Sequence, residues 1–190
     1  MRRLIRHSLT ALYLAALRLE FTLRKSVLGW ENAALRLRTM DKRVVVLILR
    51  RTGAQVGEDC DIESGITLHN CSDAQNLRIG DGCHLGKNCL LDLADRIELG
   101  SRVTVSMGCS LITHIDVGKS QRAIDFPPCS APIVLEPDVY LGCGVVVLSG
   151  VTVGRGTVAA AGAVITASTE ADSVVAGVPA TRRRGLAALQ

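Results

Sequence analysis

A six-residue repeat constrains the fold of this chain more than any other feature. From Val139 to Thr166 the sequence reads VYLGCGVVVLSGVTVGRGTVAAAGAVIT. Counting back by sixes from Ile165 gives Ala159, Val153, Val147, Leu141 and Leu135. A period of six fits neither the helical spacing of about 3.6 nor the strand alternation of about two. It therefore indicates a repeat architecture.

Six residues are enough for one short strand and one corner. Three such units close a triangular coil in which the aliphatic residue of each unit points inward. Stacked coils then hydrogen-bond to each other at the inter-strand spacing of ~4.8 Å. A small residue after the aliphatic one, as in Leu141-Gly142, suits a tight corner. The pattern predicts a mainly β solenoid.

This run resembles the hexapeptide repeat of left-handed parallel β-helix acyltransferases, and the resemblance covers roughly residues 56–184. It implies a left-handed parallel β-helix with a helical N-terminal extension and an excursion loop. The handedness comes from the resemblance alone, because left-handed crossovers are rare among parallel strands. The resemblance also implies a homotrimer with coenzyme sites between neighbouring solenoids.

The frame divides the chain into three parts. A basic helical extension covers residues 1–51, the β-helix residues 52–176, and a cofactor-binding tail residues 177–190. Short insertions break the frame at residues 70–76 and 92–98, and a longer segment, 112–134, is polar and rich in proline. Long excursions from a regular scaffold usually carry function.

The cysteines follow the same frame. Cys60, Cys83, Cys89 and Cys109 fall at the fifth place of a hexad, where Val and Thr stand elsewhere, so they are expected to be small buried thiols. The chain has seven cysteines and no CxxC pair, and the odd count favours a reducing, cytoplasmic setting.

The N-terminal extension differs in charge from the rest of the chain. Residues 1–51 hold 12 Lys and Arg against 3 acids, a net +9, whereas residues 52–190 hold 10 against 15, a net −5. Helical spacing relates Leu4, Ile5, Leu9, Leu12, Tyr13, Ala16 and Leu17. The uncharged run of residues 8–17 is too short to span a bilayer. Either this helix caps the solenoid or a neighbouring subunit, or it attaches peripherally to the inner face of a membrane.

A second helix is expected from about Trp30 to Leu49. The extension has little aromatic interleaving and no recognised nucleic-acid module, so nucleic acid is not an expected partner.

His114 is the candidate catalytic residue. It follows Thr113 and opens the excursion, as the general-base histidine does in the maltose and galactoside O-acetyltransferase branch of the family. An alcohol needs a base to attack a thioester at neutral pH, and an imidazole can take its proton. The alternative is a loop histidine hydrogen-bonded to the backbone. His69 and His84 are expected to face solvent, and no zinc shell or other metal site is expected.

Other positions match the family residue by residue. The resemblance gives Asp92 and Tyr140 roles at the acceptor side, although Asp92 is equally well explained as a corner residue that turns the chain. It assigns coenzyme contacts to the backbone at Gly142 and Ala160, and to Ile165, Thr166, Ala180 and Arg183. The alternative for Arg183, within the triplet Arg182–Arg184, is a solvated tail.

These features together predict an acetyl-CoA-dependent O-acetyltransferase without a metal. It would transfer an acyl group directly to a hydroxyl of a sugar, polysaccharide precursor or glycolipid. The alternative is a non-catalytic β-helix scaffold or binding subunit. The acceptor, its reacting atom (O or N) and the acyl length stay open.

Overall fold

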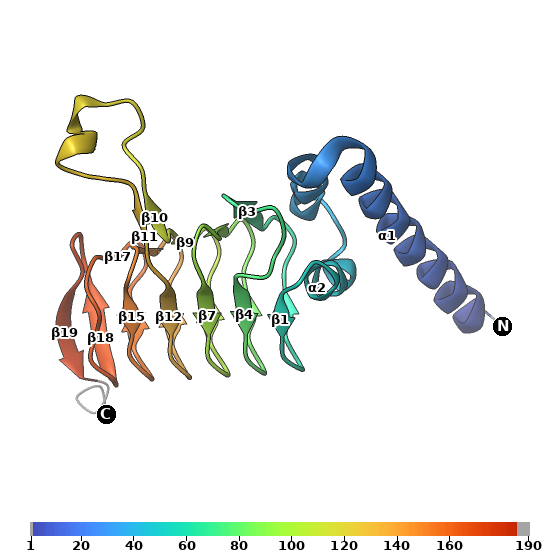
Figure 1. Cartoon of the computed structure of the whole chain (residues 1–190). Helices are drawn as coiled ribbons and strands as arrows, with labels where there is room; N and C mark the ends of the chain where they lie inside the picture. Colours follow the sequence, from blue (N-terminus) through green and yellow to red (C-terminus); the bar gives the residue numbers. More distant parts are fainter. Residues whose placement is uncertain (1, 186–190) are drawn as a thin grey trace.

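Short strands stack into three parallel sheets that wrap around one core, with a helical head beyond the first coil (Figure 1). The computed structural model describes residues 2–185, and the surroundings of side chains 10–183. The three sheets share the inward positions of the hexads as a common core. The chain is mainly β and has the predicted β-helix architecture.

The strands of each sheet follow the order of the coils. The first sheet (A) contains β1 (Gln55–Val56), β4 (Leu77–Ile79), β7 (Ile97–Leu99), β12 (Ile133–Leu135) and β15 (Thr152–Val153). The second (B) contains β2 (Asp61–Ile62), β5 (His84–Leu85), β8 (Thr104–Val105), β13 (Tyr140–Leu141), β16 (Val158–Ala159), β18 (Ser173–Ala176) and β19 (Thr181–Gly185). The third (C) contains β3 (Thr67–His69), β6 (Leu90–Asp92), β9 (Ser110–Leu111), β14 (Val146–Val147) and β17 (Val164–Ile165).

The register follows the hexad. Leu141 pairs with Val105 on one side and with Ala159 on the other, and all three are buried. The two short insertions lie between β3 and β4 and between β6 and β7. Within the three sheets of the described residues only β19 runs antiparallel, as the second strand of a hairpin with β18 that closes the last coil. Residues 181–185 of the predicted tail therefore extend sheet B.

The excursion is a projecting arm. It rises from β10 (His114–Ile115) and β11 (Cys129–Ser130), which pair antiparallel, and it carries the 3-10 helix η2 (Gln121–Ile124) near its tip (Figure 1). The frame was expected to return at Leu135, but the buried Ile133 already pairs with Ile97 in sheet A. The proline before it, Pro132, cannot donate to a ladder and marks the re-entry.

Three of the four framed cysteines, Cys83, Cys89 and Cys109, are buried as predicted, and Cys60 is half-buried. The thiols point at carbonyls of the next coil, such as Cys109 at Gly142 O, 3.2 Å away. All seven cysteines are free.

The head consists of α1 (Arg2–Ala34), the 3-10 helix η1 (Leu35–Arg38) and α2 (Lys42–Arg51). The predicted single helix from Trp30 to Leu49 is wrong, because the chain breaks and restarts inside that range. Gly29 has a non-helical backbone (φ 84°, ψ 174°) inside α1. Asp41 then caps α2 by accepting a hydrogen bond from Arg43 N at 3.0 Å.

The second half of the head covers the first coil. Leu37, Val44, Val45, Ile48 and Leu49 are buried in the same core as the solenoid strands. Leu14, Leu17 and Phe21 of α1 also pack against this core, whereas Leu12 and Tyr13 are exposed. The single apolar face predicted for residues 4–17 is thus divided, and the side chains of residues 1–9 lie outside the described part. Within residues 2–185 no helix is long and apolar enough to cross a membrane.

Candidate active site

His114 is the first residue of the arm and follows the coil that contains β9. Thr113, just before it, is fully buried, and its carbonyl accepts hydrogen bonds from Ser149 Oγ (2.8 Å) and Ala131 N (2.9 Å). One of these donors lies on the returning leg of the arm and the other on a neighbouring coil. The backbone that carries His114 is therefore fixed on both sides, while its imidazole remains 30% exposed.

A buried carboxylate holds this imidazole. The Oδ2 atom of Asp92 lies 2.6 Å from His114 Nδ1, and it also accepts from Thr113 N at 2.9 Å and His114 N at 3.1 Å. A carboxylate can only accept, so Nδ1 carries the proton and Nε2 is left as the basic nitrogen. This pairing fixes both the tautomer and the orientation of the ring.

The surroundings of Asp92 keep it ionised. Burial raises its pKa, but the hydrogen bonds from His114, Asn70 and Thr113 and the charge of His114 outweigh burial, so its pKa lies below the usual value. The Asp92 side chain is 1% exposed. Asp92 lies behind His114, where donors enclose it, and its Oδ1 also accepts from Ala94 N at 3.5 Å, as in a corner residue. Its role at the acceptor side stays a prediction.

Two further residues lie beside His114 and Asp92, and the sequence analysis did not predict either of them as a site residue. The amide nitrogen of Asn70 lies 3.0 Å from Asp92 Oδ1 and 3.1 and 3.2 Å from the two ring nitrogens of His114. The ring of His69 lies 6.3 Å from that of His114, centroid to centroid. His69 is exposed, as predicted, but it faces the site rather than open solvent.

The parallel register explains this meeting. β3 pairs with β6 so that His69 stands opposite Asp92, and β6 pairs with β9, which leads into His114. Asn70 begins the first insertion with a left-handed backbone (φ 51°), which asparagine tolerates. The sequence did contain one signal for Asn70 at the site, since this asparagine comes just after a framed strand. The insertion that follows interrupts the count by sixes, so the sequence did not show that Asn70 lies beside Asp92 and His114.

A groove leads away from His69 and Asn70 toward the head. It has a volume of about 300 Å³ and lies between η1, the end of α1 and the edge of β3. Trp30, Leu35 and Ala34 form its less polar wall. Glu31 and Arg38 also line it, and Arg38 makes no ion pair within the described residues.

Tyr140 and Gly142 belong to a different edge of the solenoid. Tyr140 lies on sheet B, 44% exposed, and within residues 10–183 no ring contact or hydrogen bond joins it to His114. Gly142 follows it at a corner stacked on Ala160. A Cβ on Gly142 would lie 2.7 Å from Ala161 N, so coil stacking alone explains the glycine. Its predicted coenzyme contact is not required to account for it.

The remaining predicted positions gather near the last coil. Thr166 is exposed, whereas Ile165 is 1% exposed in the core and its carbonyl oxygen accepts a hydrogen bond from Leu148 N at 3.1 Å. Ala180 N donates to Val164 O at 2.8 Å, which brings the two segments together. Arg183 is exposed and makes no ion pair among the described residues, whereas Arg182 is paired with Glu170.

Within the described residues, no group of three or more His, Cys, Asp or Glu side chains is arranged to hold a metal ion.

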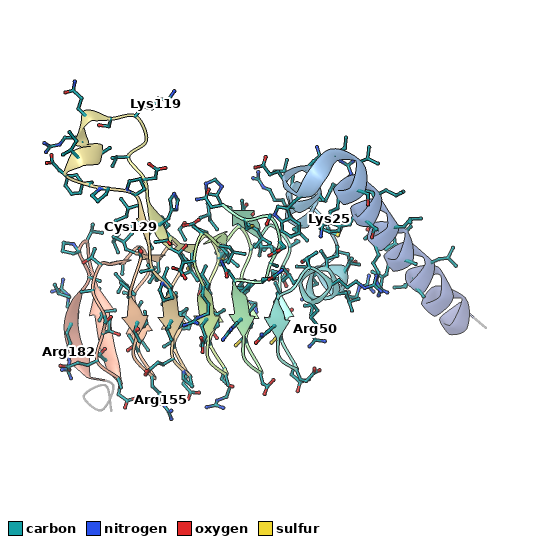
Figure 2. The ribbon with its side chains drawn as sticks, viewed as in Figure 1. Lys25, Arg50, Lys119, Cys129, Arg155 and Arg182 are labelled. Carbon is teal, nitrogen blue, oxygen red and sulfur yellow. The ribbon has the colours of Figure 1, made fainter. Side chains whose placement is uncertain are left out.

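Cys129, at the base of the arm (Figure 2), lies opposite Ile115 in the β10–β11 pair. Among the predicted site residues in the described part of the chain, only His114 and Asp92 share a hydrogen bond.

Comparison with known proteins agrees with the fold. The family model "Hexapeptide repeat of succinyl-transferase" matches residues 76–112 and 132–167, the two framed stretches on either side of the arm. These two stretches of the chain carry the hexapeptide repeat.

The solved structures similar to this hexapeptide-repeat chain share its whole architecture. A hexapeptide-repeat acetyltransferase from Vibrio cholerae superposes with a TM-score of 0.71 at 25% identity, over 92% of this chain and 93% of that one. A maltose O-acetyltransferase from Clostridium difficile 630 gives a TM-score of 0.69 at 20% identity, over 91% and 88%. A second Vibrio cholerae structure of that acetyltransferase contains acetyl coenzyme A (TM-score 0.53, 21% identity, over 90% and 88%).

Similarity in sequence is more local. The 2,3,4,5-tetrahydropyridine-2,6-dicarboxylate N-acetyltransferase of Staphylococcus aureus strain JH9 is 42% identical over 67 residues. That match covers 35% of this chain and only 28% of the Staphylococcus enzyme. The relatives and neighbours named here are all acetyltransferases.

Proposed function

We propose that this protein is an acetyl-CoA-dependent O-acetyltransferase with His114 as its general base. One observation carries the proposal: the Asp92 carboxylate lies 2.6 Å from Nδ1 of His114, a partly exposed histidine at the base of the arm. A loop histidine held only by backbone contacts, the alternative interpretation, does not need a buried carboxylate and an amide aimed at its ring. Such an arrangement is typical of a base whose free nitrogen works on a substrate.

In this proposal Nε2 of His114 takes the proton of an acceptor hydroxyl as that oxygen attacks the acetyl carbonyl carbon. The C–O bond forms, the C–S bond of the thioester breaks, and the proton passes from His114 to the leaving sulfur. Asp92 stabilises the imidazolium while the proton is held. No cysteine is needed as a covalent carrier, because Cys109 is buried in the core and Cys129 has no base beside it within the described residues.

The coenzyme supplies the activated acetyl group. The edge formed by Ala160, Thr166 and Ala180 offers small or open positions along neighbouring coils, and Arg183 is free to meet a phosphate as a charge-assisted donor. The acetyltransferase neighbour that contains acetyl coenzyme A supports this donor.

The acceptor is proposed to enter through the groove beside Asn70 and His69. Its volume of about 300 Å³ suits a sugar-sized group, and an aromatic wall with an amide, an acid and a guanidinium suits a polyhydroxylated ring. The maltose O-acetyltransferase neighbour supports a sugar hydroxyl, as part of a free sugar, a polysaccharide precursor or a glycolipid.

The proposed assembly is a homotrimer in the cytoplasm. Tyr140, Gly142 and Ala160 lie on or just after strands of sheet B, whereas His114 follows β9 of sheet C, so the proposal needs a neighbouring subunit to bring them together. The arm also exposes Ile124 (90%) and Phe126 (53%), apolar side chains that a neighbouring subunit would cover. Contact of the basic head with the inner face of a membrane belongs to the same proposal.

The first test is a thermal melt of the purified protein with acetyl-CoA, with free coenzyme A and ATP as comparators. A ligand that binds only the folded state raises the melting temperature. At a concentration of 100 times its Kd it raises the free energy of unfolding by about 2.7 kcal/mol. We expect a dose-dependent rise with acetyl-CoA and coenzyme A but not with ATP. An unchanged melting temperature at millimolar acetyl-CoA would favour a non-catalytic scaffold instead.

A further inference from the structure

A second cavity lies within the helical head, on the side where α1 passes over α2. It has a volume of about 180 Å³, and its residues are distinct from those of the acceptor groove. Phe21 and Ile48 form its apolar floor, and both belong to the core. The cavity is thus built on the part of the head that packs against the core.

Three cations line this cavity and no acid does. They are Arg18, Lys25 and Arg51, of which Lys25 is marked in Figure 2. None of the three makes an ion pair with a carboxylate in the described part of the chain, although the Lys25 ammonium lies 5.5 Å from the centre of the Trp30 ring. The nearby acid Glu20 is engaged by Arg24 and Arg36.

One hydrogen-bond donor at the cavity is shielded from solvent and has no partner among the described residues. This donor is Arg18 Nε. A buried donor without an acceptor costs about 1–3 kcal/mol, so such groups normally mark a missing partner. A phosphoryl group supplies several acceptor oxygens and matches the donor geometry of arginine.

An exposed apolar stripe runs along α1 next to the cavity. Leu12, Leu19, Leu23 and Val27 follow a spacing of three and four residues with Ala16, and they are 73%, 60%, 55% and 76% exposed. The stripe lies opposite Leu14, Leu17 and Phe21, which pack on the core. The cationic cavity lies at the border between these two faces.

We propose that this cavity binds the phosphoryl headgroup of an anionic lipid while the α1 stripe enters the lipid interface. The net charge of +9 on residues 1–51 complements an anionic surface, whereas the −5 on residues 52–190 does not. An apolar stripe beside a cation-lined cavity fits a helix that lies in the membrane plane. This inference rests on the membrane contact in the proposed function and gives it a site and a ligand, and it stands apart from the acyl-transfer chemistry.

The test measures binding of the full chain to vesicles of phosphatidylglycerol and phosphatidylcholine, and to pure phosphatidylcholine, by co-sedimentation. We expect binding only to the anionic vesicles, weakened about tenfold by Arg51→Gln, because a charge-assisted hydrogen bond to phosphate is lost. Arg38→Gln removes the same charge from the same head outside the cavity and is expected to weaken binding threefold or less. Unchanged melting temperatures confirm that both variants fold.

A second pair of variants tests the stripe. Leu19→Ser and Leu23→Ser substitute exposed positions and should each weaken vesicle binding without changing the oligomeric state. Equal losses from Arg51→Gln and Arg38→Gln would overturn the cavity as the site. Stabilisation by inorganic phosphate without vesicle binding, or loss of self-association in the serine variants, would overturn the lipid as its ligand. None of these readouts uses acetyl transfer, so this proposal and the proposed acetyl transfer fail separately.

Discussion

The solenoid body and the helical head bury their side chains by different rules. In the body, each residue's surroundings follow from its place in the hexad: Leu99, Leu111 and Leu141 all occupy first places, and all are at most 2% exposed. In the head, Leu12 and Leu14 are two residues apart, yet one is exposed and the other packs on the core. A repeat determines burial locally, whereas a single helix depends on which face meets its neighbour.

The two regions also divide the proposed work. The body holds His114, Asp92 and Asn70 on neighbouring coils whose register is fixed by ladder hydrogen bonds. The head supplies half of the residues that line the acceptor groove and most of those that line the cation-lined cavity. Substitutions in the body are therefore expected to change chemistry and stability, and those in the head to change binding.

The largest expected effect is on the base itself. His114→Ala should lower kcat/KM by about 10²–10⁴, the usual contribution of a positioned general base. The acetyl-CoA-induced rise in melting temperature should persist, because His114 does not hold the coenzyme in this proposal. Steady-state kinetics and a thermal melt check both points. Full activity in this variant would refute His114 as the base.

The next comparison sets a body leucine against a head leucine. Leu99→Ala removes a side chain that is 2% exposed in the solenoid core and should destabilise the fold by about 2–5 kcal/mol. Leu19→Ala changes a side chain that is 60% exposed and should stay within about 0.5 kcal/mol of the native chain. Urea denaturation measures both. A large loss for Leu19→Ala would mean that the stripe is covered, for example by a second copy.

Asp92→Asn tests the link between His114 and its carboxylate. The amide keeps the shape of the side chain but can no longer stabilise an imidazolium, so kcat should fall by about 10²-fold while both KM values stay near their native level. An unchanged kcat would show that Asp92 is only structural.

The same residue predicts how stability depends on pH. Because the folded pKa of Asp92 is lowered, its ionised form stabilises the native state above the unfolded pKa of about 4, and this contribution is lost as the pH falls through the folded value. The stability advantage of the native chain over Asp92→Asn should therefore be constant between pH 5 and pH 7 and should shrink at about pH 3. Denaturation curves at several pH values measure it, and an advantage that grew in acid would contradict the assigned ionisation.

The smallest effect is expected in the acceptor groove. Arg38→Gln should raise KM for an anionic or sugar acceptor by about three- to tenfold, with kcat and the KM for acetyl-CoA unchanged, since it alters binding without touching the reacting atoms. Arg78→Gln, an exposed arginine of the body without an ion pair among the described residues, is the matched control. Equal effects from the two would place the acceptor elsewhere.

The sequence alone determined the coil. Its six-residue period predicted which aliphatic side chains point inward, where the insertions interrupt the frame, and that Cys83, Cys89 and Cys109 are buried. The position of His114 at the opening of the excursion could also be predicted, because a frame that stops at a given residue identifies the start of the arm. These features depend only on residues within one repeat, so they can be predicted from the order of residues along the chain.

Only the tertiary structure decided what surrounds His114. Asn70, His69 and Asp92 reach it across two strand pairings, after an insertion that the period does not count. The break at Gly29 and the division of α1 into a packed face and an exposed face depend on how the head docks on the first coil. Contacts between residues more than twenty positions apart depend on the register of the strand pairs and on how the head docks on the first coil. The local pattern of apolar and polar side chains does not determine either of these.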